Sequence, residues 1–177
     1  MKINVVVYGC DNTGKTTLCD QLIEFLNSNG VPAKKVKSLG VADFQKQVSF
    51  VSQQLADIKN EWEICIYDRF PIIEEEVCGT LLRNKNHFEK YPDFVNNVLK
   101  KISFFIHCDP GLETILNWGE REQMEGIKER AKDLNDLYAA YAAVHKIESR
   151  VIDYNFKTDN WLDIANLLYN YYTLIAR

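Results

Sequence analysis

A nine-residue segment near the start of the chain constrains the fold more than any other feature. Residues 9–17 read Gly-Cys-Asp-Asn-Thr-Gly-Lys-Thr-Thr and match the pattern G-x-x-x-x-G-K-[ST]. The segment follows an apolar run over residues 3–8 and precedes a helical pattern that begins at Thr16, as a loop between a buried strand and a helix requires. There, backbone N–H groups and the helix dipole converge on an anion. The motif therefore predicts a nucleoside triphosphate site.

The spacing within this loop predicts a role for each type of residue. Gly9 and Gly14 allow backbone conformations and close approaches that a Cβ atom would block. Lys15 is expected to reach the β- and γ-phosphates, and the Thr16 hydroxyl is expected to ligate Mg²⁺. The predicted ligands are therefore ATP and Mg²⁺, and the predicted ATP-binding residues are Gly9, Asn12, Thr13, Gly14, Lys15, Thr16 and Thr17.

Length and composition limit the fold and the partners. A chain of 177 residues without a linker or a repeat is expected to form one domain over residues 1–177. We expect no signal peptide, because Asn4 and the phosphate loop interrupt the first apolar run early. No membrane partner is expected either, because no apolar stretch approaches the roughly 20 residues that span a bilayer. The five scattered cysteines lack metal-binding spacing and are expected to be free thiols of a cytoplasmic protein. A formal net charge of −4 argues against a large nucleic-acid footprint.

Apolar runs alternate with longer helical patterns along the chain, which is typical of a parallel α/β sheet. We predict strands at residues 3–8, 33–38, 64–67, 102–107 and 151–152. Helices are predicted from the phosphate loop to about residue 29, and over about residues 42–59, 93–101, 123–145 and 161–175.

A second informative segment, residues 67–71, reads Tyr-Asp-Arg-Phe-Pro and lies at the end of the third predicted strand. Ligands of an open α/β sheet gather at the carboxyl ends of its strands. Asp68 is therefore expected near the phosphate loop, where a carboxylate can orient Mg²⁺ or accept a proton. The guanidinium of Arg69 can clamp a phosphate through two hydrogen bonds.

These two segments together resemble the thymidylate kinase-like group of P-loop kinases. The phosphate loop is similar to that group's G-x-D-G-x-G-K-[ST]-T, including the acidic Asp11, and residues 68–70 are similar to its D-R-[YF] signature. Residues 121–130 resemble the arginine-bearing lid and the following helix, with Tyr138 or Tyr141 in the place of the tyrosine at the helix end. Residues 68–83 are also similar to small bacteriophage P-loop kinases, whose acceptors include nucleotides and modified bases in DNA.

The resemblance implies a three-layer α/β/α domain of P-loop NTPase type, with a five-stranded parallel sheet in the order 2-3-1-4-5 and a helical lid at about residues 118–126. It also implies that Asp11 approaches the acceptor sugar or the reacting phosphate, and that Tyr154 and Asn155 border the adenine. The predicted catalytic residues are Lys15, Asp68, Arg69, Arg121 and Asp11. The predicted metal-binding residues are Thr16 and Asp68, and the predicted acceptor-binding residues are Asp11, Arg69, Phe70 and Arg83.

The chain departs from the family pattern in segments that concern the acceptor. Residues 37–40 read Lys-Ser-Leu-Gly where thymidylate kinases have an Arg-Glu-Pro-Gly-Gly-Thr type of segment. Glu74 and Cys78 follow the Asp-Arg-Phe-Pro segment where relatives often have serine and tyrosine, and Asn117-Trp118 lies near a frequent arginine position. These departures affect the acceptor site and leave the donor chemistry intact.

The arginines outside the two main segments each have two interpretations. Arg121 and Arg130 lie at lid spacing, where an arginine can stabilise charge on the transferring phosphate. Both also fit a solvated charged helix with i,i+4 ion pairs, although function is favoured for Arg121. Arg83 is either an acceptor-phosphate ligand or a solubilising loop residue.

Aromatic and acidic side chains provide further candidates. Phe44, Phe70 and Tyr91 could stack on a nucleobase. Phe44 is expected in the core, and Phe70 is favoured because it adjoins Asp-Arg. The glutamates at residues 74–76 are expected to form a solvated helix face rather than a Mg²⁺ or sugar-hydroxyl site.

The predicted function is Mg²⁺-dependent transfer of the ATP γ-phosphoryl group to a deoxynucleoside monophosphate, with a pyrimidine, dTMP, as the expected acceptor. The first alternative is a hydroxyl acceptor, on a deoxynucleoside or on a 5-hydroxymethylpyrimidine in DNA, and only this alternative makes polymeric nucleic acid a partner. A hydroxyl benefits from a carboxylate that takes its proton, and Asp68 or Asp11 could serve. The second alternative is a nucleotide-binding switch without kinase turnover. A homodimer is compatible with each of these.

Overall fold

The computed structural model describes residues 1–38, 43–56, 62–117, 127–146 and 151–176. Five parallel strands form one sheet in the order β2-β3-β1-β4-β5, which confirms the predicted topology. The strands are β1 (Lys2–Tyr8), β2 (Ala33–Lys37), β3 (Glu63–Asp68), β4 (Phe104–Cys108) and β5 (Val151–Tyr154).

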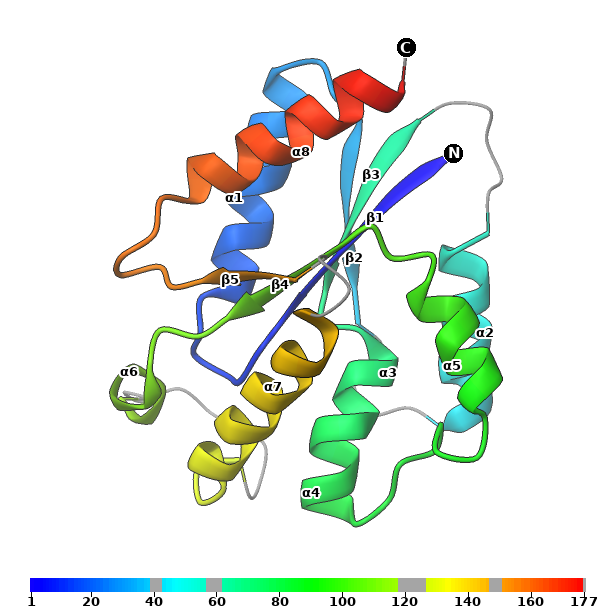
Figure 1. The fold of residues 1–177 in the computed structure, drawn as a ribbon, viewed down its shortest axis with the longest axis vertical. Helices are drawn as coiled ribbons and strands as arrows, with labels where there is room; N and C mark the ends of the chain where they lie inside the picture. Colours follow the sequence, from blue (N-terminus) through cyan, green and yellow to red (C-terminus); the bar gives the residue numbers. More distant parts are fainter. Residues whose placement is uncertain (39–42, 57–61, 118–126, 147–150, 177) are drawn as a thin grey trace.

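Helices cover both faces of this sheet, so the three-layer α/β/α prediction is also confirmed. Helices α1 and α8 lie on one face, and α2, α3, α5 and α7 lie on the other (Figure 1). The helical elements are α1 (Lys15–Ser28), α2 (Phe44–Gln54), α3 (Pro71–Glu74), the π-helical turn η1 (Glu75–Gly79), α4 (Thr80–Arg83), α5 (Pro92–Leu99), α6 (Leu112–Leu116), α7 (Ala131–Lys146) and α8 (Trp161–Ile175).

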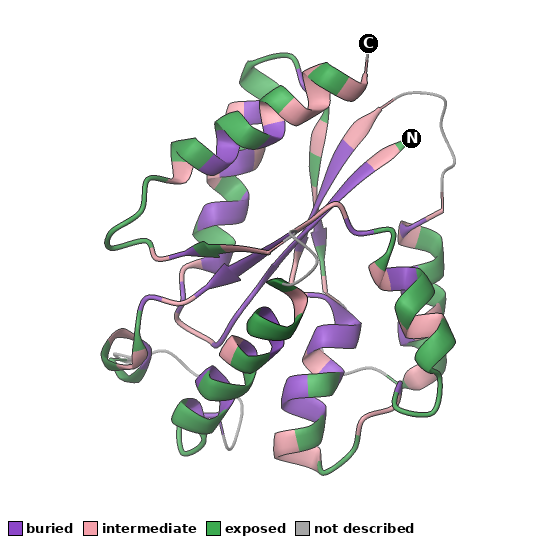
Figure 2. Ribbon diagram, in the orientation of Figure 1, coloured by how far each residue is buried: buried purple, intermediate pink, exposed green. Residues whose placement is uncertain are grey.

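The central strand β1 shows why its sequence is a continuous apolar run rather than an alternating one. Val5 and Val7 pack against the side of the sheet covered by α1 and α8, whereas Val6 and Tyr8 pack against the opposite side. A parallel strand that is buried on both faces needs apolar side chains at every position. The central strands are correspondingly buried in Figure 2.

Several predicted boundaries differ from the structure. Strand β4 begins two residues later than predicted, because its pairing with β1 starts at Phe104 opposite Val5. Helix α2 ends at Gln54, with Leu55 as its C-cap. Helix α7 begins at Ala131 rather than at residue 123, since residues 127–130 form turns and residues 118–126 lie outside the described ranges. No described helix is both long and apolar enough to cross a bilayer. All five cysteines are free and buried, as expected.

Candidate active site

The phosphate loop leaves β1 and enters α1 in the predicted context. Gly9 has a φ of 140°, and a Cβ atom there would overlap the carbonyl oxygen of Cys108 at the end of β4. Gly14 has a φ of 80° and is the N-cap of α1. Only glycine adopts such conformations readily, so the two motif glycines allow the chain to turn tightly between β1, β4 and α1.

Lys15 is the first residue of α1 and is buried, with 5% of its surface exposed. Its ammonium donates hydrogen bonds to the carbonyl oxygen of Cys10 and to Thr13 Oγ1, the latter over 3.3 Å. Thr13 Oγ1 in turn donates to the same carbonyl oxygen over 2.9 Å. The loop therefore orients this cation with its own oxygen atoms, next to the N-terminus of α1 where an anion is favoured.

The ends of β2 and β3 bring two further charges to Thr16. Thr16 Oγ1 donates a hydrogen bond of 2.7 Å to Asp68 Oδ2. The ammonium of Lys35 lies 3.6 Å from that same carboxylate oxygen and 2.8 Å from Asp20 Oδ1. Sequence reasoning missed Lys35, although Lys35 and Lys37 share one face of a strand whose carboxyl end was expected at the site.

The hydroxyl of Thr16 and the carboxylate of Asp68 fit a magnesium site that is completed by a nucleotide. Both supply oxygen ligands, which Mg²⁺ prefers, and in kinases the ion is held by one or two such groups together with the substrate phosphates. Within the described part of the chain, no group of three His, Cys, Asp or Glu side chains could hold a metal ion without such help.

Arg69 joins the phosphate loop to the segment after β3. Its φ is 72°, an uncommon value for a residue with a side chain, and its N–H donates to the carbonyl oxygen of Val7. The guanidinium forms ion pairs with Asp11 and, through Nη1 over 2.9 Å, with Glu74 Oε2. Although burial acts to lower the pKa of Arg69, the carboxylate of Glu74 raises it above the ordinary value. Strained backbones of this kind often occur at functional sites.

Glu74 and Glu75 do not form the solvated helix face that we expected. Glu74 Oε1 also accepts a hydrogen bond of 2.9 Å from Tyr138 Oη on α7. Glu75 is only 2% exposed and accepts hydrogen bonds from Gln47, Arg83 and His87. Burial acts to raise the pKa of Glu75, but these hydrogen bonds and the charge of Arg83 lower it, so the carboxylate is ionised.

The glutamate run was misread because the partners of Glu74 and Glu75 come from distant elements, and the π-helical turn η1 begins only at Glu75. A π-helical turn shifts the positions that follow it relative to a regular α-helix, and such turns often occur at functional sites. Hydrophobic periodicity assumes 3.6 residues per turn and cannot reveal this shift. Gly79 at the end of η1 allows a close approach, because a Cβ atom there would lie 2.6 Å from the carbonyl oxygen of Lys85.

A cavity of about 730 Å³ opens beside the phosphate loop. It brings together four of the predicted site residues, Thr16, Asp68, Arg69 and Arg83. The remaining lining residues come from α1, from β2 and the residue after it, from α2, from the helices after β3, and from the segment before α7: Asp20, Lys35, Lys37, Ser38, Gln47, Pro71, Glu74, Glu75, Cys78, Leu82 and Ile127. The volume is in the range of small-molecule sites.

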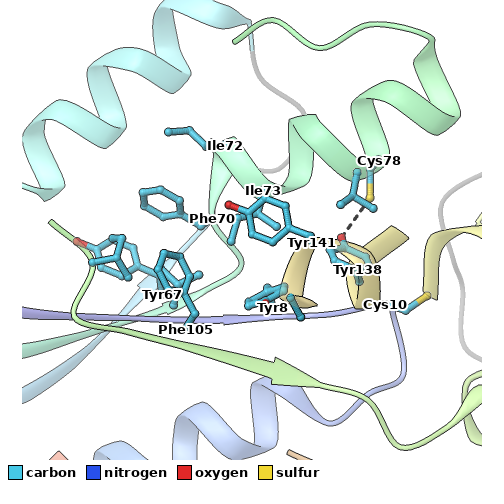
Figure 3. Packing of buried hydrophobic residues seen from close by; sticks show 14 of the residues in the cluster. Tyr8, Cys10, Tyr67, Phe70, Ile72, Ile73, Cys78, Phe105, Tyr138 and Tyr141 are labelled. Carbon is cyan, nitrogen blue, oxygen red and sulfur yellow. Dashed lines mark hydrogen bonds between the residues drawn. The ribbon is translucent and has the colours of Figure 1, made fainter. Parts of the chain in front are cut away.

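Phe70 does not line this cavity, and the structure corrects its predicted role. Its ring is completely buried and packs edge to face against Tyr67, with 5.4 Å between the ring centroids. A ring in this position has no free face for a base. Figure 3 shows Phe70 in the hydrophobic cluster that also contains Tyr138, whose hydroxyl lies 3.3 Å from Cys78 Sγ.

The other aromatic candidates are two residues near α2 and α5 and two near the end of β5. Phe44 packs against the core, as expected, and stacks on Tyr91 with 4.8 Å between centroids. Tyr154 is buried. Sequence reasoning missed Phe156, whose exposed ring lies 3.1 Å from where a Cβ atom of Gly14 would be.

The structure describes some of the arginines that were predicted to act at the site, but not all of them. Arg130 is partly exposed and pairs with Asp133 at i,i+3, as in the interpretation of a solvated charged helix. Arg121 and the predicted lid at residues 118–126 lie outside the described residues. Arg83 lines the cavity and pairs with Glu75.

Comparisons with known proteins support the fold. No protein-family model and no curated protein matches this chain. Among solved structures, the YorR protein of Bacillus subtilis, in complex with phosphorylated GDP, is 18% identical, with a TM-score of 0.64 over 97% of this chain and 96% of that one. Deoxyadenosine kinase from M. mycoides with bound dATP is 19% identical, with a TM-score of 0.59 over 97% of this chain and all of the other. The chain thus has the three-layer fold seen in P-loop kinases.

Proposed function

We propose that this chain is a Mg²⁺-dependent phosphotransferase that moves the γ-phosphoryl group of ATP to an acceptor of nucleoside or nucleotide type. One observation carries the proposal: Thr16 belongs to the phosphate loop and also lines the cavity, where it hydrogen-bonds to Asp68. A donor site and an acceptor-sized cavity therefore meet at these two residues. The fold shared with a deoxyadenosine kinase supports this reading.

The proposed roles follow from where the charges lie. Lys15 and the loop amides hold the donor phosphates, and the ring of Phe156 is placed to contact the donor base. Thr16 and Asp68 hold Mg²⁺, which neutralises charge on the phosphate oxygens when bound. Arg69 lies on the acceptor side, where its two carboxylate partners fix its orientation. Positioning and charge neutralisation account for most of the catalysis of phosphoryl transfer.

The two acceptors considered from the sequence use this cavity differently. A deoxynucleoside monophosphate, with dTMP as the sequence-based expectation, would place its phosphate on Arg69 and Arg83. A hydroxyl acceptor would instead place its proton near a carboxylate. Both acceptors are compatible with the same donor site.

Transfer of label from γ-labelled ATP tests the proposal. The protein is incubated with Mg²⁺ and with all nucleosides, all nucleoside monophosphates, and duplex DNA with and without 5-hydroxymethyluracil. We expect label in one of these organic acceptors. Label in inorganic phosphate alone, with every acceptor present, would contradict transfer and favour a nucleotide-binding switch.

Asp68→Asn is expected to raise the Mg²⁺ concentration for half-maximal activity by roughly 10–100-fold, the usual effect of losing a group that orients metal ligands. The amide keeps the size of the side chain but loses the charge that faces Thr16 and Lys35. A Mg²⁺ titration of turnover measures this. Asp163→Asn, which changes an exposed carboxylate of α8, is the control. An identical Mg²⁺ requirement for wild type and Asp68→Asn would exclude Asp68 from the metal site.

Arg69→Lys is expected to lower kcat/KM for the acceptor by at least about tenfold, since a hydrogen bond to a charged group contributes ~1.5–3 kcal/mol. A single ammonium cannot bridge Asp11 and Glu74 as the planar guanidinium does. ATP affinity, measured by calorimetry, should change much less. Arg130→Lys is the matched control, since Arg130 makes an exposed pair on α7. Equal losses of affinity for ATP and acceptor would argue against an acceptor-side role for Arg69.

A further inference from the structure

We propose that the acceptor is the hydroxyl group of a free, uncharged nucleoside, and that Glu74 is the catalytic residue that takes its proton. This inference rests on the proposed phosphotransferase function and specifies its acceptor. Glu74 stands where the resemblance to thymidylate kinases leads one to expect serine, and the structure turns it toward the cavity.

The charges that line the cavity argue against a phosphate-bearing acceptor. Four cationic and four anionic side chains line it, so its described wall carries no net formal charge. Arg69 is already paired with two carboxylates, and Arg83 with one. Lys35 also has two carboxylate partners. Lys37 alone among these cations forms no ion pair with a described residue, and it is exposed.

A monophosphate would have to displace the partners of Arg69 to be clamped by its guanidinium. The displaced carboxylates of Asp11 and Glu74 are only 16% and 18% exposed, so each would lose its counter-charge in a largely buried place. Leaving a buried charge unpaired is costly. A hydroxyl group requires no such exchange, because it donates its hydrogen bond to a carboxylate that keeps its arginine.

Glu74 has the free acceptor capacity that this role needs. Its Oε2 accepts from Arg69 over 2.9 Å and lies 3.9 Å from the Cys78 thiol, and its Oε1 accepts from Tyr138 over 2.9 Å. An ionised carboxylate offers about four acceptor positions, so at least one is left for a substrate hydroxyl. Burial raises the pKa of Tyr138 well above its ordinary value, which keeps that hydroxyl a donor. Burial, with the charge of Glu74 as a smaller cause, raises the pKa of the Cys10 thiol in the phosphate loop to about 11.

The remaining carboxylates near the cavity are less suited to this step. Asp68 belongs to the proposed metal site, and Glu75 is nearly inaccessible and held by three side chains. Asp20 is largely exposed and paired with Lys35. Asp11 does not line the cavity. Glu74 is thus the carboxylate that combines contact with the cavity, a fixed orientation and room for a further donor.

The proposed step balances without another reactant. The hydroxyl oxygen of the nucleoside forms a bond to the γ-phosphorus of ATP, and the bond from that phosphorus to the β,γ-bridging oxygen breaks. ADP leaves with the electron pair, and the hydroxyl proton passes to Glu74. Because the transition state of phosphoryl transfer is loose, the proton leaves late.

The decisive variant is Glu74→Gln, tested with γ-labelled ATP and two acceptor sets: free nucleosides and their monophosphates. The amide can still accept from Tyr138 but cannot take a proton. We expect kcat with nucleosides to fall at least about a hundredfold, in line with the usual contribution of a general base. Calorimetric affinity for ATP should stay within about twofold. Glu76→Gln, which changes the exposed neighbour in η1, should behave as the wild type.

Two further measurements distinguish proton transfer by Glu74 from a purely structural role, and the first of them needs only the wild type. The wild type should convert nucleosides to labelled monophosphates faster than monophosphates to labelled diphosphates. The pH profile of kcat with nucleosides should lose its acidic limb in the residual activity of Glu74→Gln.

Preferred phosphorylation of monophosphates, label in 5-hydroxymethyluracil DNA alone, or full nucleoside turnover by Glu74→Gln would each overturn the inference while the phosphotransferase function stands. Absence of label from every acceptor, with ATP still bound, would instead remove the proposed function itself.

Discussion

Lys15→Ala should lower kcat by at least about a hundredfold while the fold stays intact, because the ammonium neutralises charge that develops on the donor phosphates. The side chain is buried, and its contacts are to Cys10 and Thr13 of the loop itself. Its removal should therefore act at the donor site and leave the sheet undisturbed. Release of ADP at saturating acceptor measures the effect.

Lys132→Ala is the matched control, since this exposed lysine of α7 forms an i,i+4 pair with Asp136 away from the candidate site. Its turnover should equal that of the wild type. Circular dichroism and thermal unfolding of Lys15→Ala should show a native fold. A correctly folded Lys15→Ala protein with unchanged turnover would remove Lys15 from the mechanism.

Gly9→Ala should lower the free energy of unfolding by roughly 2–6 kcal/mol, the sum of two costs. A residue with a side chain at a φ of 140° carries backbone strain of roughly 1–3 kcal/mol. The added Cβ atom would also overlap the carbonyl oxygen of Cys108, and such overpacking costs roughly a further 1–3 kcal/mol. Since that oxygen belongs to backbone at the end of β4, no side-chain rotation can relieve the overlap.

Gly30→Ala separates these two causes. Gly30 follows α1 with a φ of 76°, and an added Cβ atom would meet no other atom within 4 Å. Gly30→Ala should lower the free energy of unfolding by only about 1–2 kcal/mol, the cost of the left-handed conformation. Urea unfolding of both variants gives the comparison. Equal losses of unfolding free energy at the two positions would show that the contact with Cys108 does not matter.

The sequence alone determined the β1–loop–α1 arrangement of the architecture, which is the proposed donor half of the candidate site. The phosphate loop has a strict spacing because its backbone must turn at Gly9 and Gly14, and such backbone requirements leave a readable pattern. The sheet order was also predicted correctly. Buried parallel strands form continuous apolar runs, so their existence could be read from the sequence, while their ends could only be placed within a few residues. Their order was expected from the resemblance to thymidylate kinase-like proteins.

Only the tertiary structure decided how the proposed acceptor half is arranged. Glu75, the first residue of the π-helical turn, lies in the interior, where Gln47 and His87, which are distant in the sequence, reach it. Likewise, Glu74 faces the cavity through its contacts with Arg69 and with Tyr138, which lies 64 positions further along the chain.

Phe70 and Lys35 both show that the local sequence does not reveal the partners of a side chain. A place beside Asp-Arg suggested a ligand role for Phe70, yet its ring fills the core. An unremarkable lysine of β2 meets Asp68, because β2 and β3 are parallel neighbours in the sheet. Backbone geometry is specified locally and can be predicted from a motif. The direction and partner of a charged side chain depend on which distant elements pack beside it, and that is decided only when the chain folds.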